Sequence, residues 1–244
     1  MDHDKLPRTV PLELPDIQTV FLPSPHHQNP RFRPLPWQPA PRPPSTPLNT
    51  FLLTVFAKAH RSLYLQTPNL TAPPVLSALL SALARGLDVH IVTSRRLMIL
   101  EQLVTAGMTT ERCVWRLVRR YLRMWKERMG LVSADERSVE EGQAITMSVG
   151  RLRIEYYQPK ARSGGHDQED AYKTAEPVQS HLKLTVADNE LVILGSGNLD
   201  RASWYTSQEL GVAFFSTEFA SRLTRTLDAV LKERKILVFD SDGT

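Results

Sequence analysis

The chain has 244 residues, of which 41% are hydrophobic and 23% charged, proportions typical of ordinary globular proteins. Its apolar runs are far shorter than the roughly 20 residues of a membrane-spanning helix, and its first residues lack the apolar segment of a signal peptide. The net charge of +4 weakly favours phosphate-bearing or polyanionic partners. The single cysteine, Cys113, excludes an internal disulfide, and its helical surroundings predict a buried thiol. We therefore expect an intracellular protein, cytoplasmic or peripherally membrane-associated, with no transmembrane segment.

Proline separates the first part of the chain from the rest. Thirteen of the 18 prolines lie between Pro7 and Pro47, a density that no helix or central strand tolerates. We interpret residues 1–47 as a proline-rich, extended arm or interdomain linker that contacts a domain through residues 20–22 and Trp37. The alternative, a ligand for a proline-recognising module, rests on composition alone.

After residue 47 the pattern changes to alternating helices and strands. In chain order we first predict a helix over 49–60, a strand over 62–67, a helix from 73 to 86 and a strand over 87–93. A helical stretch over 98–129, which breaks near 107, follows. The rest comprises strands over 148–157, 181–186 and 190–194, a helical turn over 201–204, a strand over 209–215 and a helix over 216–234. The strand, helix, strand order between 62 and 93 predicts a parallel crossover. Residues 48–244 are therefore expected to form a single α/β domain.

The second half of the long helical stretch is basic and amphipathic. Seven Arg and Lys side chains between Arg112 and Arg128 alternate with apolar and aromatic residues such as Trp115. One interpretation is a surface helix with a stripe that faces the core. The other is peripheral contact of residues 111–128 with an anionic membrane or a phosphate. We regard residues 98–130 as a helical insertion in the domain.

Residues 160–180 are rich in Gly, Asp, Glu and Lys and show no periodicity, which predicts a mobile loop. The loop runs directly into the next predicted strand. It is either a lid over a site on that strand or an inert surface insertion.

That strand begins the most informative pattern in the chain. Apolar and polar residues alternate between His181 and Val186, which predicts that His181 and Lys183 share one face. An imidazole and an ammonium on one face suit a bound phosphate. The pattern continues with Asp188, Gly195, Ser196 and Asn198.

At every fixed position these residues match the HKD motif of the phospholipase D superfamily: His181, Lys183, Asp188, Gly195, Ser196 and Asn198. Residues 198–204 and Glu209 resemble the family's continuation, and residues 64–68 resemble the start of such a domain. The similarity covers residues 48–244 apart from the helical insertion, and it most resembles the C-terminal repeat of two-motif, cardiolipin-synthase-like proteins. It implies a phospholipase D-like α/β domain with a mixed, largely parallel β-sheet flanked by helices.

The candidate catalytic residues are His181, Lys183, Asp188 and Glu209. Lys183, Ser196 and Asn198 are donors that can surround the nonbridging oxygens of a phosphate. A neutral His181 can attack phosphorus and form a phosphohistidine. The resemblance implies that Glu209 orients His181, that Asp188 is mainly structural, and that no metal or other cofactor takes part. The scattered histidines and single cysteine likewise give no zinc pattern.

The family's active site contains two HKD motifs, whereas this sequence has one. Three explanations are open: a homodimer that brings two copies of His181 together, the C-terminal half of a longer protein whose N-terminal HKD half is missing, or a half-site that binds without turnover. In the second case His181 is the general acid. We expect a phosphodiesterase or transphosphatidylase that acts on phospholipid. The alternatives are a nuclease of the same family, less favoured because the resemblance and the basic aromatic helix point to lipid, and a catalytically incomplete half with a binding or regulatory role.

Overall fold

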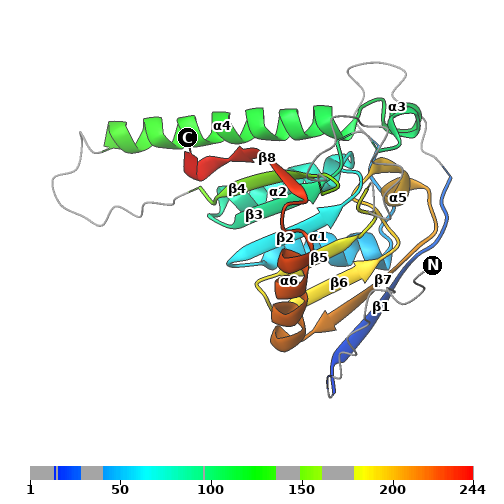
Figure 1. The fold of residues 1–244 in the computed structure, drawn as a ribbon. Coiled ribbons are helices and arrows are strands. Elements are labelled where there is room, and N and C mark those ends of the chain that lie inside the picture. Colours follow the sequence, from blue (N-terminus) through cyan, green and yellow to red (C-terminus); the bar gives the residue numbers. More distant parts are fainter. Residues whose placement is uncertain are drawn as a thin grey trace.

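The computed structural model describes residues 14, 16–28, 41–95, 97–135, 149–160 and 179–243. Within them, eight strands form one sheet in the order β1-β7-β6-β5-β2-β3-β4-β8 (Figure 1). The strands are β1 (Gln18–Ser24), β2 (Ser62–Thr67), β3 (Asp88–Thr93), β4 (Leu152–Tyr157), β5 (Leu184–Ala187), β6 (Leu191–Gly195), β7 (Glu209–Phe215) and β8 (Lys235–Asp240). The α-helices are α1 (Pro47–Lys58), α2 (Pro73–Ala84), α3 (Ile99–Ala106), α4 (Thr110–Asp135), α5 (Arg201–Tyr205) and α6 (Thr217–Val230). The predicted α/β class is confirmed.

The sheet is mixed, as predicted, but the expectation that it is largely parallel is wrong. Among the described strands, β2 with β3 and β3 with β4 are parallel neighbours, and the other five neighbouring pairs are antiparallel. The parallel pairs are those joined by helical crossovers, first α2 and then α3 with α4, so the crossover predicted between 62 and 93 is confirmed. The short connection of residues 188–190 makes the chain reverse at once between β5 and β6. The other antiparallel pairs join strands that are distant in the sequence or separated by α5.

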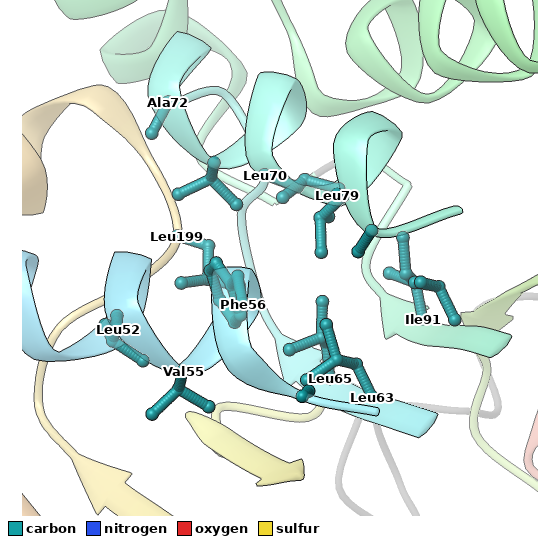
Figure 2. Close-up of a cluster of buried hydrophobic side chains, with 14 of the residues drawn as sticks. Leu52, Val55, Phe56, Leu63, Leu65, Leu70, Ala72, Leu79, Ile91 and Leu199 are labelled. Atoms are coloured by element: carbon teal, nitrogen blue, oxygen red, sulfur yellow. The ribbon is translucent and has the colours of Figure 1, made fainter. Parts of the chain in front are cut away.

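Helices cover both faces of the sheet, so the strands that lead to the candidate motif are buried. The larger core lies on the face covered by α1, α2 and α4; Figure 2 shows part of it, including Leu52, Val55, Phe56, Leu63, Leu65, Leu79 and Ile91. Helix α6 covers the opposite face (Figure 1), over Leu184, Val186 and Val192. Burial on both sides fixes the position of β5 and β6 through non-directional apolar contacts.

Local signals in the sequence set the helix ends. The side chain of Thr46 accepts a hydrogen bond from the backbone N–H of Asn49 at 3.2 Å, so α1 begins at Pro47, slightly before the predicted start. Proline again opens α2, at Pro73. The chain leaves α2 through Gly86 with φ of 90°, a left-handed conformation that glycine adopts without strain.

Two edge strands, β1 and β8, are absent from the sequence prediction. Strand β1 lies in the segment expected to be a polyproline-like arm, and it pairs with β7 along residues 18–24. Pro23 is tolerated there because an edge strand has one side without ladder partners. At the other end of the chain α6 stops at Val230, and Glu233, with φ of 61°, turns the chain into β8. Of the expected arm, Trp37 lies outside the described residues.

The break predicted near Gly107 is confirmed, because α3 ends at Ala106 and α4 begins at Thr110. Apolar side chains of α4, among them Leu117 and Tyr121, are buried in the main core, which confirms the predicted core-facing stripe. Cys113 is buried, as expected, and burial raises the pKa of its thiol to about 11. In the part of the chain that the structure describes, no helix is long and apolar enough to cross a bilayer. Most of the loop expected over 160–180 lies outside the described residues.

Candidate active site

The motif residues other than Asp188 gather at the edge of the sheet where β2 and β3 end. Lys183 precedes β5, Ser196 follows β6 and Glu209 begins β7. Because β5 runs antiparallel to both β2 and β6, and β7 antiparallel to β6, these three positions fall at the same edge. Lys183 also lines one small cavity together with Gly195 and Gly197.

The strand predicted over 181–186 begins later, at Leu184, so His181 and Lys183 lie outside the ladder. The neighbouring strand gives the reason. Gln66 pairs with Leu184, and β2 ends at the next residue, before Pro68. Proline has no N–H to donate and takes the chain out of the ladder. The expectation that a strand holds His181 and Lys183 on one face is therefore wrong.

His181 and Lys183 nevertheless lie in direct contact. The Lys183 Nζ lies 2.7 Å from Nδ1 and 3.0 Å from Nε2 of His181, and it also donates to the His181 carbonyl oxygen at 3.0 Å. An ammonium can only donate, and its contacts with both ring nitrogens do not select one of them as the acceptor. A bound phosphate that drew the Lys183 ammonium away would leave the imidazole free to react.

Ser196 is held by strand β7. Its hydroxyl donates to Oε2 of Glu209 at 2.5 Å and accepts from the backbone N–H of Leu210 at 3.1 Å, while its own N–H donates to the Leu210 carbonyl at 3.0 Å. Among the hydrogen bonds of the described residues, none joins Glu209 to His181. The carboxylate expected to orient His181 thus orients the Ser196 hydroxyl in this structure.

A close approach of two backbones requires glycine before Ser196. A Cβ atom on Gly195 would lie 2.6 Å from the carbonyl oxygen of Leu210, inside any normal contact distance. The absence of a side chain lets β6 and β7 come together. This approach puts the Ser196 hydroxyl within reach of Glu209.

Asn198 is held by a polar cluster that the sequence analysis does not identify. Its Nδ2 donates to Oδ2 of Asp200 at 3.2 Å, and its backbone N–H donates to Oγ of Ser203 at 3.0 Å. Asn69 donates to the same Asp200 oxygen at 3.4 Å. Because a carboxylate only accepts, Asp200 fixes which way the Asn198 amide points. The buried Oδ1 of Asn198 has no hydrogen-bond partner within the described residues.

Partial burial shifts the proton affinity of the candidate phosphate-binding cation. Desolvation lowers the pKa of Lys183 from its usual 10.5, and the negative charges of Glu209 and Asp200 act against that shift. These two carboxylates are thus near enough to Lys183 to interact with it. The site thus combines one cation, Lys183, with two carboxylates, Glu209 and Asp200.

Asp188 lies at the other end of β5, about 16 Å along the chain from Lys183 at strand spacing. Its carboxylate accepts three backbone N–H groups at the start of β2: Oδ1 from Arg61 at 2.7 Å and from Ser62 at 2.9 Å, and Oδ2 from His60 at 2.9 Å. Burial would raise the pKa of Asp188, but these N–H groups and the Arg61 charge outweigh it, so the pKa is lowered. In this structure the Asp188 carboxylate thus joins the turn after β5 to the start of β2, and its structural role stays a prediction.

The cavity beside Lys183 has a volume of about 20 Å³. That is room for about one water molecule, and far below the roughly 300 Å³ of a small ligand pocket. The described part of the chain therefore offers a phosphate a set of donors at a surface and no enclosed pocket. Among the described residues, no group of three or more His, Cys, Asp or Glu side chains is placed to hold a metal ion.

Gln66 is a further residue of the site that the sequence analysis leaves out. It is buried at the end of β2, where its Nε2 donates to Oγ of Ser180 at 2.7 Å and its Oε1 accepts from the hydroxyl of Tyr64 at 3.1 Å. Its hydrogen bond to Ser180 thereby holds the segment that leads into His181. The available signal for Gln66 was a long polar side chain next to the apolar Leu65 within a predicted strand, and for Asp200 it was a helix cap.

The comparisons with known proteins concern nearly the whole chain. The profile of a family described as "Cardiolipin synthase, PLD-like domain" matches residues 52–231. No curated protein sequence matches the chain significantly. Among solved structures, NucT from Helicobacter pylori is similar with a TM-score of 0.51 at 11% identity, over 92% of this chain and 100% of that one.

Two further solved structures show the same likeness. Nuc from Salmonella typhimurium, titled a phospholipase D family member, has a TM-score of 0.51 at 16% identity, over 91% of this chain and 99% of that one. Phosphatidylserine synthase from Haemophilus influenzae Rd KW20 has a TM-score of 0.50 at 12% identity, over 93% of this chain and 41% of that one.

At these identities the structural likeness shows the fold alone, whereas the family profile covers more than half of the chain. The matched range includes the candidate site from His181 to Glu209. Sequence profile and fold agree, and the chain belongs to the phospholipase D superfamily, whose members are phosphodiesterases or phosphatidyltransferases.

Proposed function

We propose that this chain supplies one half-site of a phospholipase D-type phosphodiesterase or transphosphatidylase that acts on phospholipid. The observation that carries the proposal is the contact of Lys183 with His181 at the sheet edge where Ser196 also lies. Two observations support lipid as the substrate class: the matched family is described by a lipid enzyme, and α4 is a basic helix with an exposed tryptophan, Trp115.

The proposed reaction proceeds in two displacements. The substrate phosphate draws the Lys183 ammonium away from His181 and the Ser196 hydroxyl proton away from Glu209. The nonbridging oxygens then accept from Lys183, from that hydroxyl and from the Asn198 amide, which stabilises charge in the transition state. A ring nitrogen of His181 then forms a bond to phosphorus while the bond to the leaving alcohol oxygen breaks and that oxygen takes a proton from a general acid. Water or a second alcohol displaces the histidine and returns the proton.

The second histidine is the part of the proposed site that comes from elsewhere. The donors around Lys183 lie at an open surface beside a cavity of about 20 Å³, which supports a half-site completed by a second histidine. A second copy of this chain or a separate HKD half would supply it. In the second arrangement His181 can itself be the general acid, and the partner's histidine the nucleophile.

The deciding experiment tests whether the substrate phosphate becomes attached to His181. Purified chain is incubated with phosphatidylglycerol, phosphatidylcholine or DNA, products are measured, and phosphorylated histidine is sought by mass spectrometry after acid-free quenching. We expect turnover of lipid and a phosphate on His181 that are both lost in His181→Ala. His60, an exposed histidine on the far side of β2, gives the matched control, since His60→Ala should behave as the wild type.

Each other outcome has a defined meaning. Equal turnover by His181→Ala would refute the mechanism. Turnover of DNA in place of lipid would keep the phosphodiesterase and refute the substrate class. A well-folded chain that light scattering shows to be monomeric, with no turnover of any substrate, would mean a catalytically incomplete half.

A further inference from the structure

Helix α3 buries a glutamine and exposes several of its apolar residues. Its buried residue is Gln102, at 3% exposure, whereas Leu100 is 79% and Val104 74% exposed. Ile99 and Leu103 extend the same apolar face, at 38% and 47% exposure. Surface helices of globular proteins show the opposite arrangement. A contiguous apolar patch on a surface marks a site of interaction with another molecule.

The inverted orientation is fixed by hydrogen bonds around Gln102. Its Nε2 donates to Oδ1 of Asn69 at 2.7 Å and to the Leu97 carbonyl at 2.5 Å, and its Oε1 accepts from the N–H and hydroxyl of Thr110 at 2.5 and 3.0 Å. Since a buried amide left without partners is costly, α3 cannot easily turn its leucines inward. The apolar face is therefore a built feature of the fold.

The same hydrogen bonds connect α3 to the candidate active site. Asn69, which accepts from Gln102, donates to Asp200, and Asp200 holds the Asn198 amide. Helix α3 also contacts α5, and Figure 1 shows the two helices at the same end of the molecule. Helix α3 thus lies beside the polar cluster that holds Asn198, and its apolar face is exposed at the same end of the molecule as the candidate site.

The arginines of α4 come close to the end of α3. The Arg116 Nη1 lies 3.3 Å from the sulfur of Met108, in the link between α3 and α4. Between α2 and α4 a cleft of about 580 Å³ is lined by apolar residues, by Trp115 and by Arg116, Arg119, Arg120 and Arg123. Within the described residues, none of these four guanidinium groups has a carboxylate at ion-pair distance, and Arg119 lies over the Trp115 ring at 4.5 Å. Their charge is available to an external anion.

We propose that α3 and the arginines of α4 form a docking surface for an anionic lipid bilayer. The apolar face of α3 enters the boundary between headgroups and acyl chains, and Arg116 and Arg120 contact lipid phosphates. Docking brings the edge of the sheet that carries His181 to the layer where phospholipid phosphates lie. The inference rests on the proposed lipid phosphodiesterase activity for its purpose, but vesicle binding can be measured without catalysis.

The test is sedimentation with vesicles of phosphatidylcholine alone or mixed with phosphatidylglycerol. We expect the wild type to bind the mixed vesicles. The double variant Leu100→Ser/Val104→Ser should bind them at least about tenfold less tightly, because two apolar side chains no longer enter the membrane. The double variant Arg116→Gln/Arg120→Gln should lose about 25-fold, since each basic residue at an anionic surface contributes roughly fivefold. Val230→Ser, which removes an apolar side chain 52% exposed on α6, is the matched control and should bind as the wild type.

The inference is overturned if the wild type does not bind mixed vesicles, or if Leu100→Ser/Val104→Ser, shown to be folded by circular dichroism, binds as tightly as the wild type. If the wild type ignores vesicles while that variant changes its oligomeric state in light scattering, the face binds protein. Hydrolysis of the soluble diester bis(p-nitrophenyl) phosphate separates the two proposals. Hydrolysis without vesicle binding refutes the docking surface alone, and vesicle binding without hydrolysis refutes activity of this chain by itself while the docking surface stands.

Discussion

Asp188 allows a direct test of whether one residue of the motif acts by stabilising the fold. Its carboxylate joins the turn after β5 to the start of β2 through three backbone N–H groups. At about 1 kcal/mol for each hydrogen bond that is lost, Asp188→Ala forfeits roughly 3 kcal/mol. Asp188 also has φ of 54°, a left-handed conformation that costs alanine about 1 kcal/mol more. The expected loss is about 4 kcal/mol in the free energy of unfolding.

Asp188→Asn is the matched variant, because asparagine accepts the left-handed conformation and keeps one acceptor oxygen. That oxygen can retain the bonds from Arg61 and Ser62, while the amide nitrogen loses the bond from His60, so a loss of about 1 kcal/mol is expected. Urea unfolding followed by circular dichroism measures both variants. An Asp188→Ala protein within about 1 kcal/mol of the wild type would refute the reasoning, as would equal losses for the two variants.

The same interaction has a definite pH dependence. The pKa of Asp188 is lowered in the folded protein, so its stabilising effect is present above the unfolded pKa of about 4 and is lost as the pH falls through the folded value. The difference in stability between wild type and Asp188→Ala should therefore narrow below about pH 4. A difference that stays constant down to low pH would show that the carboxylate charge is not what binds the three N–H groups.

Three further predictions concern the site and its support. Gly195→Ala should force β6 and β7 apart, because its Cβ would lie 2.6 Å from the Leu210 carbonyl oxygen. We expect the free energy of unfolding in urea to fall by about 2 kcal/mol and turnover to be lost. The control Gly130→Ala, with open space around it, should keep both its stability and its turnover. Glu155 is buried, and hydrogen bonds from His90, Arg153 and Lys235 hold its pKa below the usual range against the opposing effect of desolvation. Glu155→Gln should cost about 3 kcal/mol, since the ion pairs of the buried Glu155 carboxylate with Arg153 and Lys235 are lost, and a loss below about 1 kcal/mol would contradict this. Because desolvation lowers the pKa of Lys183 from 10.5, the alkaline limb of the pH–rate profile should lie below that value and move upward in Lys183→Arg; a limb that does not move would show that another group limits the rate.

Prediction from sequence succeeds where one local signal decides the structure. Proline at 73 and glycine at 86 mark the helix between two parallel strands, and Gly107 separates α3 from α4. The polar alternation near His181 fails for a non-local reason. Whether residues 181–183 join the sheet depends on β2, which ends at Thr67 because Pro68 follows. Periodicity within one segment cannot report where its partner stops.

The candidate site divides in the same way. The motif match groups Lys183 and Ser196 as candidate phosphate donors, and in the structure both lie next to the ends of paired strands at one edge of the sheet. The hydroxyl of Ser196 on Glu209, and the buried Asn69 and Asp200 around Asn198, depend on contacts between strands and loops far apart in the sequence. A single sequence shows which residue types could make such contacts, but it does not show which residues are in contact in the fold.

Strand β1 bears on which residues a shortened form of this domain must retain. It pairs with β7 from Gln18 opposite Phe215 to Ser24 opposite Glu209, so an N-terminal segment that the family profile omits lies beside the carboxylate that holds Ser196. A chain shortened to start at residue 48 would lose this neighbour. Strand β7 would then become an open edge, with unpaired N–H and C=O groups next to Leu210 and Phe215, both already partly exposed. Such an edge invites pairing between molecules, and an insoluble or inactive shortened protein would reflect a missing strand and say nothing against the chemistry of the motif.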